Sequence, residues 1–231
     1  MHPDILGSVD MASMTLFFDP PYKGNRAAHL LRGAIGRNFQ DPIFHQHQEG
    51  VLYRYPLVQY RWANNRGVIA GINEGAGAIT GLSLAGRVLD LEGQKLAVRE
   101  AELDFWRKEI SVSPVLQRYY FKSPWLPFHQ ENYRKYRQMG HREKTVERDR
   151  LLVANLLTTL KSLGIQVPCR LYASFFMRKS LPCRYKEEEL VGFLGDVVTN
   201  VVIPSGLGIG KAVSHGYGWL AIECERNDEG E

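Results

Sequence analysis

The chain has 231 residues, of which 44% are hydrophobic and 23% are charged, and its formal net charge is +4 at pH 7. This composition excludes a disordered polyelectrolyte, and no uncharged apolar run approaches the roughly 18 residues of a membrane-spanning helix. We expect a globular, cytoplasmic protein with no membrane partner, because the first residues lack the features of a secretory signal and the three distant cysteines fit reduced thiols.

The first half of the chain alternates strand-like and helix-like segments. We predict a strand, a helix with one apolar face, a β-hairpin around an Asn/Gly cluster, a short helix and a strand. The order β-α-β-β-α-β is that of a ferredoxin-like unit. In chain order the segments are Met11–Phe18, Asn25–Phe39, Tyr53–Trp62 with Val68–Ile72, Gly75–Leu84 and Leu96–Leu103.

The second half has a similar plan and contains the strongest helical signal. A leucine stripe predicts a helix from about Val146 to Leu163, which Gly164 ends. A basic, tyrosine-bearing stretch, Tyr133–Arg150, holds seven Lys or Arg against three Asp or Glu. We place the boundary near Pro114, which divides an α+β protein into domains 1–114 and 115–231. The other segments are a strand at Val115–Phe121, strands or short helices at Leu171–Arg178 and Leu190–Leu194, and two strand-like runs within Val197–Cys224.

The most informative segment is glycine-rich and covers Ile203–Trp219. Glycines let a backbone approach a ligand closely, successive N–H groups bind phosphate oxygens, and Lys211 adds a positive charge. The segment is not a P-loop, because Ser205 stands where that motif needs its first glycine and Ala212 follows the lysine. It is not a dinucleotide fingerprint, because it ends in a strand-like run instead of a helix. A glycine-rich hairpin without a chemical role is the alternative interpretation.

Four segments together resemble a known family. The glycine-rich segment has the order G-x-G-x-G-K, then S-H-G-aromatic-G and a closing strand-like run. The other three are His29–Phe39 (HLLRGAIGRNF), Tyr53–Tyr60 (YRYPLVQY) and Ser123–Tyr136 (SPWLPFHQENYRKY). This set resembles the RAMP superfamily of CRISPR-associated RNA-binding proteins, and within it the Cas six family of repeat-cleaving endoribonucleases. The resemblance implies tandem ferredoxin-like (RRM-like) domains, CRISPR repeat RNA as partner, and metal-independent cleavage within each repeat without a cofactor.

Metal-free RNA cleavage requires a base for the 2′-hydroxyl, an acid for the departing 5′-oxygen, and donors that stabilise the charged phosphorane. Histidine suits both proton transfers, because its ordinary pKa is about 6.5. The resemblance places catalytic histidines just after the first helix, and one branch has a His-x-His like His45-Gln46-His47. Tyr53 and Arg37 flank this pair and are predicted to orient or neutralise the scissile phosphate. We expect His47 to be the main acid or base and His45 its partner, with the assignment within the pair left open.

Other interpretations of the histidines stay open at this point. His45 and His47 also fit a metal site in a nucleotide-binding protein, or two solvated residues of a loop. His29 faces away from the apolar side of its helix and is a further candidate. His215 lies among the glycines, where it either holds RNA or stabilises a turn.

RNA contacts are predicted in two segments, the glycine-rich segment and the basic stretch, which is suited to follow an RNA backbone. A solvated connection is the alternative for the basic stretch, and Arg54, Arg61 and Arg66 are alternative contacts. The second function that the sequence allows is a non-catalytic RAMP subunit that holds guide RNA in an interference complex. A homodimer and contacts with other complex subunits are left open. The predicted RNA-binding residues are Gly206, Gly208, Gly210, Lys211, Ser214, His215, Gly216, Arg134, Lys135 and Arg137.

Overall fold

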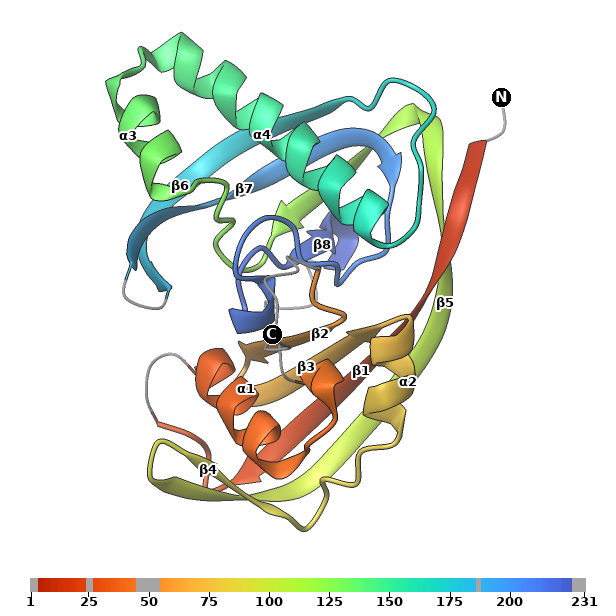
Figure 1. Cartoon of the computed structure of the whole chain (residues 1–231), viewed down its shortest axis with the longest axis vertical. Coiled ribbons are helices and arrows are strands. Elements are labelled where there is room, and N and C mark those ends of the chain that lie inside the picture. The colour runs from red at the N-terminus through yellow and green to blue at the C-terminus, as the bar shows by residue number, and fades with distance from the viewer. Residues whose placement is uncertain (1–3, 24–26, 45–54, 186–187, 226–231) are drawn as a thin grey trace. The chain divides into compact units, whose positions relative to one another are not determined.

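The computed structural model describes residues 4–23, 27–44, 55–185 and 188–225 (Figure 1). The chain divides into two compact units, which we call the N-unit and the C-unit. The N-unit comprises Val9–Lys108 and Val213–Gly216, and the C-unit comprises Met1–Ser8, Glu109–Ala212 and Tyr217–Glu231. Strand β5 carries the chain from one unit to the other, and the boundary expected near Pro114 also lies on this strand and stays a prediction.

The N-unit has the strand order of a ferredoxin-like sheet, β2-β3-β1-β5. Helices α1 and α2 pack on this sheet through one hydrophobic core that includes Leu16, Leu31, Ile35, Ile69 and Ile79. The predicted β-α-β-β-α-β plan is confirmed. The elements are β1 (Asp4–Asp19), α1 (Ala27–Asn38), the 3-10 turn η1 (Pro42–Phe44), β2 (Val58–Ala63), β3 (Arg66–Ile72), α2 (Glu74–Thr80), β4 (Val88–Leu91) and β5 (Gln94–Phe121).

Turn residues explain where the N-unit hairpins form. Asn64 and Asn65 join β2 to β3 with φ of 49° and 58°, the left-handed conformation that a tight two-residue hairpin requires and that asparagine tolerates. Glu92 and Gly93 make a similar turn between β4 and β5, with φ of 57° and 86°. Strand β4 was not predicted from the sequence, because four residues are too few to show an alternating pattern.

The C-unit repeats the ferredoxin order with β6-β7-β5 and with β8 on the other side of β5. Helix α4 lies across β6 and β7 (Figure 1). The glycine-rich segment occupies the place in the chain that a second helix takes in a ferredoxin-like unit. The elements are α3 (Gln130–Gln138), α4 (His141–Ser162), β6 (Ala173–Tyr185), β7 (Glu188–Val202) and β8 (Leu220–Ile222), and the 3-10 turn η2 (Val213–His215) belongs to the N-unit.

The predicted start of the long helix at Val146 is wrong, because α4 begins at His141. The backbone N–H of Gly140 donates to Glu143 Oε2 at 2.7 Å, which satisfies a donor at the helix start. The first turns of α4 are mostly exposed and therefore lack the apolar spacing that reveals a helix in sequence. The leucine stripe is confirmed further along, where Leu152, Leu156 and Leu160 are buried. Gly164 follows with φ of 77°.

Trp125 is the centre of the C-unit core and is fully buried. Its indole stacks on Phe121 with 5.6 Å between ring centroids and meets Phe175 edge-on at 5.1 Å. The indole Nε1–H donates to Asn155 Oδ1 of α4 at 3.0 Å, so the polar atom of this residue is also satisfied. Trp125 therefore joins the sheet, the helix and, through Gly210, the glycine-rich segment.

Candidate nucleic-acid interface

Three of the four predicted catalytic residues, His45, His47 and Tyr53, lie outside the described residues, so their roles stay predictions. The fourth, Arg37, is exposed in the last turn of α1. Its Nη2 donates to the backbone oxygen of Asp90 on β4 at 2.7 Å. This single bond to a neutral acceptor leaves the positive charge of Arg37 uncompensated at that contact.

The two arms of the glycine-rich segment, residues 203–212 and 217–219, form a narrow hairpin within the C-unit. The backbone N–H of Gly206 donates to Leu220 O, and that of Ile209 donates to Gly218 O, each at 2.8 Å. Gly208 is bridged to Trp219 in the same antiparallel sense. The backbone N–H of Gly206 is therefore used in a hydrogen bond between the two arms of the hairpin. The RNA-binding role of the segment stays a prediction.

Gly210 shows why this hairpin needs glycine. Its φ is 96°, and a Cβ atom at this position would lie 2.8 Å from the indole Cδ1 and Nε1 of Trp125. Any larger residue would be strained and would overlap the ring. The backbone N–H of the next residue, Lys211, donates to Leu126 O at 3.0 Å. The core thus holds the backbone that carries the Lys211 side chain.

The tip of the glycine-rich segment, η2 with Gly216, packs on α1 within the N-unit. Ser214 is buried, which is an unfavourable position for direct contact with RNA, and His215 is half-buried. Gly216 has φ of 90°, and a Cβ atom there would lie 2.7 Å from Cβ of Ala28. The His29 and His215 rings are 18° from parallel with 4.9 Å between centroids, and their Nδ1 atoms are 2.8 Å apart, so the rings meet edge to edge. Both histidines were sequence candidates, and the structure brings them together.

His129 is a functional candidate that the sequence did not reveal. Burial lowers its pKa, the positive charge of Lys211 lowers it further, and Glu188 acts in the opposite direction. A lowered pKa favours the neutral imidazole, so His129 adds a polar group and no positive charge to this part of the C-unit. The available signal was its position just before α3, four residues ahead of the basic stretch.

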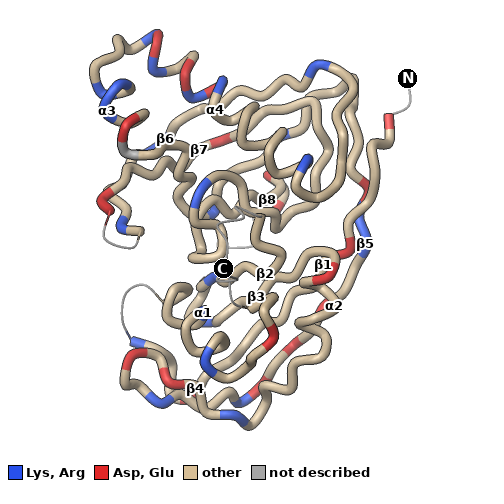
Figure 2. The backbone as a smooth tube through the Cα atoms, viewed as in Figure 1, with Lys and Arg blue, Asp and Glu red and all other residues tan. Residues whose placement is uncertain are grey.

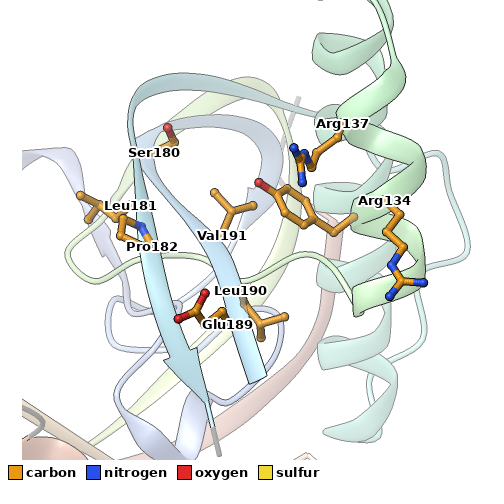
Figure 3. Close-up of a pocket in the computed structure, with 9 residues that line it drawn as sticks. Arg134, Arg137, Ser180, Leu181, Pro182, Glu189, Leu190 and Val191 are labelled. Carbon is orange, nitrogen blue, oxygen red and sulfur yellow. The ribbon is translucent and has the colours of Figure 1, made fainter. Parts of the chain in front are cut away.

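A groove of about 550 Å³ separates α3 from β6 and β7 in the C-unit (Figure 3). The Arg137 side chain extends toward the two strands, whereas the Arg134 guanidinium points away from them (Figure 3). The third predicted contact on this helix, Lys135, is exposed and does not line the groove. The groove is lined by Tyr133, Arg134, Arg137, Ser180, Leu181, Pro182, Glu189, Leu190 and Val191.

A buried arginine links α4 to α3, the helix that lines one side of the groove. Arg148 of α4 is 7% exposed, and its Nη1 donates to the hydroxyl of Tyr136 on α3 at 2.6 Å. Its Nη2 donates to Thr145 at 3.1 Å, and both acceptors are neutral. Figure 2 shows Lys and Arg at intervals along α3 and the start of α4, with acidic residues between them. The excess positive charge of this region is therefore mainly on α3, which has three Lys or Arg against one Glu, whereas residues 141–150 have four against three acids.

Replacing Arg134 and Arg137 together with alanine is expected to weaken RNA binding about tenfold, because both guanidinium groups are predicted to neutralise backbone phosphate. The slope of log affinity against log salt concentration should fall by about 0.7 for each phosphate that is no longer neutralised. Fluorescence anisotropy at several salt concentrations measures both quantities. Arg178→Ala is the matched control, because this β6 arginine lies outside the basic stretch and is paired with Asp196 at 2.6 Å. Unchanged affinity and slope in the double variant would remove α3 from the interface.

The arginines of the aromatic hairpin are less suited to contact RNA. Arg61 is 4% exposed, and burial lowers its pKa to about 10. Its Nη2 donates to Gln59 Oε1 at 2.9 Å on the same strand. Arg66 is exposed and lies over the ring of Phe17 at 4.5 Å, while Arg54 lies outside the described residues.

Two kinds of feature are absent from the described residues. No helix in the described part of the chain is both long and apolar enough to cross a membrane. Within the same residues, no three His, Cys, Asp or Glu side chains are grouped so as to hold a metal ion. His45 and His47, the residues proposed for a metal in the alternative interpretation, lie outside that part.

Sequence comparisons match the chain in both halves. Residues 10–109 match the Cas6b N-terminal domain, and residues 111–222 match the Cas6b C-terminal domain. Uncharacterized protein MJ0978 of Methanocaldococcus jannaschii is 31% identical over 132 residues, which cover 57% of this chain and 90% of that protein.

Solved structures share the fold over almost the whole chain. A crystal structure of Cas6b has a TM-score of 0.82 at 22% identity and covers 93% of this chain and 99% of its own. A structure of the CRISPR RNA processing endoribonuclease Cas6b has a TM-score of 0.73 at 24% identity, covering 92% and 99%. A Cas6 product complex has a TM-score of 0.60 at 18% identity, covering 93% and 99%. Because the two Cas6b domain matches follow one another along nearly the entire sequence, the chain belongs to the Cas6b family.

Proposed function

We propose that this protein is a metal-independent endoribonuclease that cleaves CRISPR precursor RNA within each repeat to give mature guide RNAs. The observation that carries the proposal is the match to both Cas6b domains, one after the other, over residues 10–109 and 111–222. The basic groove beside α3 and the cations Lys211 and Arg37 support it, because they supply positive charge for an RNA backbone.

The proposed reaction is an internal transfer at phosphorus. A base removes the proton of the 2′-hydroxyl, the 2′-oxygen bonds to the adjacent phosphorus, and the bond from phosphorus to the 5′-oxygen breaks. An acid protonates that 5′-oxygen, so the products carry a cyclic 2′,3′-phosphate and a 5′-hydroxyl. No water is consumed and no electron is transferred.

We assign the proton transfers to His47 and His45, and phosphate contacts to Tyr53 and Arg37. An arginine stabilises the charged phosphorane but does not donate a proton near neutral pH, so the acid and base are histidines or a tyrosine. The exposed position of Arg37 at the end of α1, just before the segment that contains His45 and His47, supports its assignment to the phosphate.

Cleavage of the cognate repeat RNA is expected to proceed at an unchanged rate in EDTA, because none of the proposed steps uses a metal. A repeat with deoxyribose at the nucleotide before the cut should bind with similar affinity and resist cleavage, because it lacks the attacking oxygen. Denaturing gels of end-labelled RNA, with phosphatase treatment to identify the cyclic phosphate, measure both outcomes. Cleavage only with added divalent metal contradicts the mechanism, and binding without turnover under all conditions favours a non-catalytic RNA-holding subunit.

A further inference from the structure

The contact between His29 and His215 joins two segments that are 186 positions apart in the chain. His29 lies in the first turn of α1, and His215 ends η2, the tip of the glycine-rich segment. Their rings are 18° from parallel with centroids 4.9 Å apart, and the Nδ1–Nδ1 distance is 2.8 Å. At this distance the two nitrogens share one hydrogen.

Sharing one hydrogen restricts the protonation of both rings. In the neutral pair one ring carries its hydrogen on Nδ1 and the other on Nε2, so the two tautomers are opposite. A first added proton leaves one Nδ1–H donor and one bare Nδ1, and the bond becomes charge-assisted. A second added proton places two N–H donors against each other, which breaks the bond. The pair therefore takes up its protons in two coupled steps.

The surroundings oppose the second proton as well. The elements that pack on α1 and η2 are β2, β3, β4 and η1. Among their described residues and those of α1, the charged side chains are Arg32, Arg37, Arg61, Arg66 and Asp90. The phenol of Tyr60, also on β2, stays neutral because burial raises its pKa, although Arg32 opposes this shift. Among these described residues four are basic and one is acidic, so a second positive charge on the pair would add to a net positive charge on the packed elements.

Because η2 and the first turn of α1 pack closely, the hydrogen bond between the two histidine side chains also connects the backbones of these two segments. Gly216 follows His215 directly and lies so near Ala28 that a Cβ atom would be 2.7 Å from the Cβ of that alanine. η2 therefore rests on the first turn of α1, the helix that leads through η1 to the segment containing His45 and His47. A change in the histidine pair is transmitted to this contact, because neither backbone has room to adjust separately.

We propose that His29 is a positioning residue. It forms a pair with His215 that holds at most one shared proton. This pair keeps the tip of the glycine-rich segment on α1 in the orientation that binds an RNA phosphodiester. The RNA part of this inference rests on the proposed function. The singly protonated pair has one positive charge spread over two rings, which suits a phosphate. Double protonation separates the rings, so RNA binding declines at acidic pH by more than the titration of one histidine explains.

Two variants of His29 separate the hydrogen bond from the ring contact. His29→Phe keeps an aromatic ring at the contact and removes the bond, whereas His29→Asn keeps a polar group near the Nδ1 position and does not titrate. His29→Phe should raise KM for repeat RNA about threefold to tenfold, the value of one hydrogen bond, with kcat changed less. His29→Asn should restore KM at neutral pH and abolish the additional decline at acidic pH. His141→Ala, which removes an exposed histidine of α4, is the control.

Measurements on the RNA-free protein test whether His29 and His215 form the hydrogen-bonded pair. Long-range proton–nitrogen NMR spectra should show opposite tautomers for His29 and His215 and two separate titration steps, replaced by one step for His215 in His29→Phe. Amide exchange at Gly216, whose N–H donates to Val213 O at 3.3 Å, should be faster in that variant. Identical tautomers with independent titration overturn the pair, and an unchanged KM in His29→Phe overturns its positioning role. A wild-type protein that cleaves no repeat RNA removes the proposed function, while the NMR and exchange results still decide the pair.

Discussion

Replacing His47 with alanine is expected to slow single-turnover cleavage of repeat RNA by about 10²- to 10⁴-fold, the usual contribution of a positioned acid or base. RNA affinity should change little, because the groove beside α3 and the glycine-rich segment are intact. The rate constant is measured with protein in excess over end-labelled RNA, and the affinity with an uncleavable deoxy-substituted repeat. A loss of rate without a loss of affinity would identify His47 as a catalytic residue.

The comparison with His45→Ala tests the assignment within the pair. If the two residues act as acid and base, each single variant should lose most of the activity, and the double variant should lose little more, because residues that act as a unit are not additive. His141→Ala should retain the wild-type rate. An active His47→Ala protein would exclude this histidine from the site and would turn attention to His29 and His215.

Trp125→Ala is expected to have the largest effect on stability and to lower the free energy of unfolding of the protein by about 3–5 kcal/mol. The side chain is fully buried, it contacts the rings of Phe121, Phe175 and Phe193, and the variant would also leave Asn155 Oδ1 without its donor. Urea titration followed by far-ultraviolet circular dichroism measures the change.

The matched control for this prediction is Phe176→Ala. Phe176 is an aromatic residue of the same unit but is 56% exposed, so its removal should change stability by less than about 0.5 kcal/mol. Trp125→Ala should also weaken RNA binding, because Gly210 rests on the indole and would lose its support. A loss of stability below about 1 kcal/mol would show that the core closes over the missing ring and that Trp125 is not its centre.

Short-range patterns predicted much of the fold, because they report on residues that are neighbours in a turn or a helix. Asn64 and Asn65 marked the β2–β3 hairpin, and the leucine stripe marked the buried face of α4. The start of α4 was misplaced, because its first turns face solvent and their stability depends on polar contacts such as Gly140 with Glu143. β4 was missed because so short a strand is recognisable only by its partner β5.

The candidate functional residues also divide into features that the sequence indicated and contacts that only the structure revealed. Motif order in the sequence indicated the family, because residue types and spacing are sufficient for such a resemblance, and the role of the glycine-rich segment in binding RNA stays a prediction. The sequence did not indicate that Gly210 packs on Trp125 or that the charge of Lys211 lowers the pKa of His129. These contacts depend on where the sheet and α3 place distant parts of the chain.

The amino-acid sequence by itself determined the two ferredoxin-like halves, the membership of a CRISPR-associated family and the set of candidate histidines. Only the tertiary structure decided that residues 213–216 leave the half of the chain to which they belong in sequence and join the N-unit. It also decided that His29 meets His215, although each was a separate candidate in the sequence. The physical reason is that periodicity and turn chemistry act over a few residues, whereas contacts between remote segments follow from the packing of a complete core.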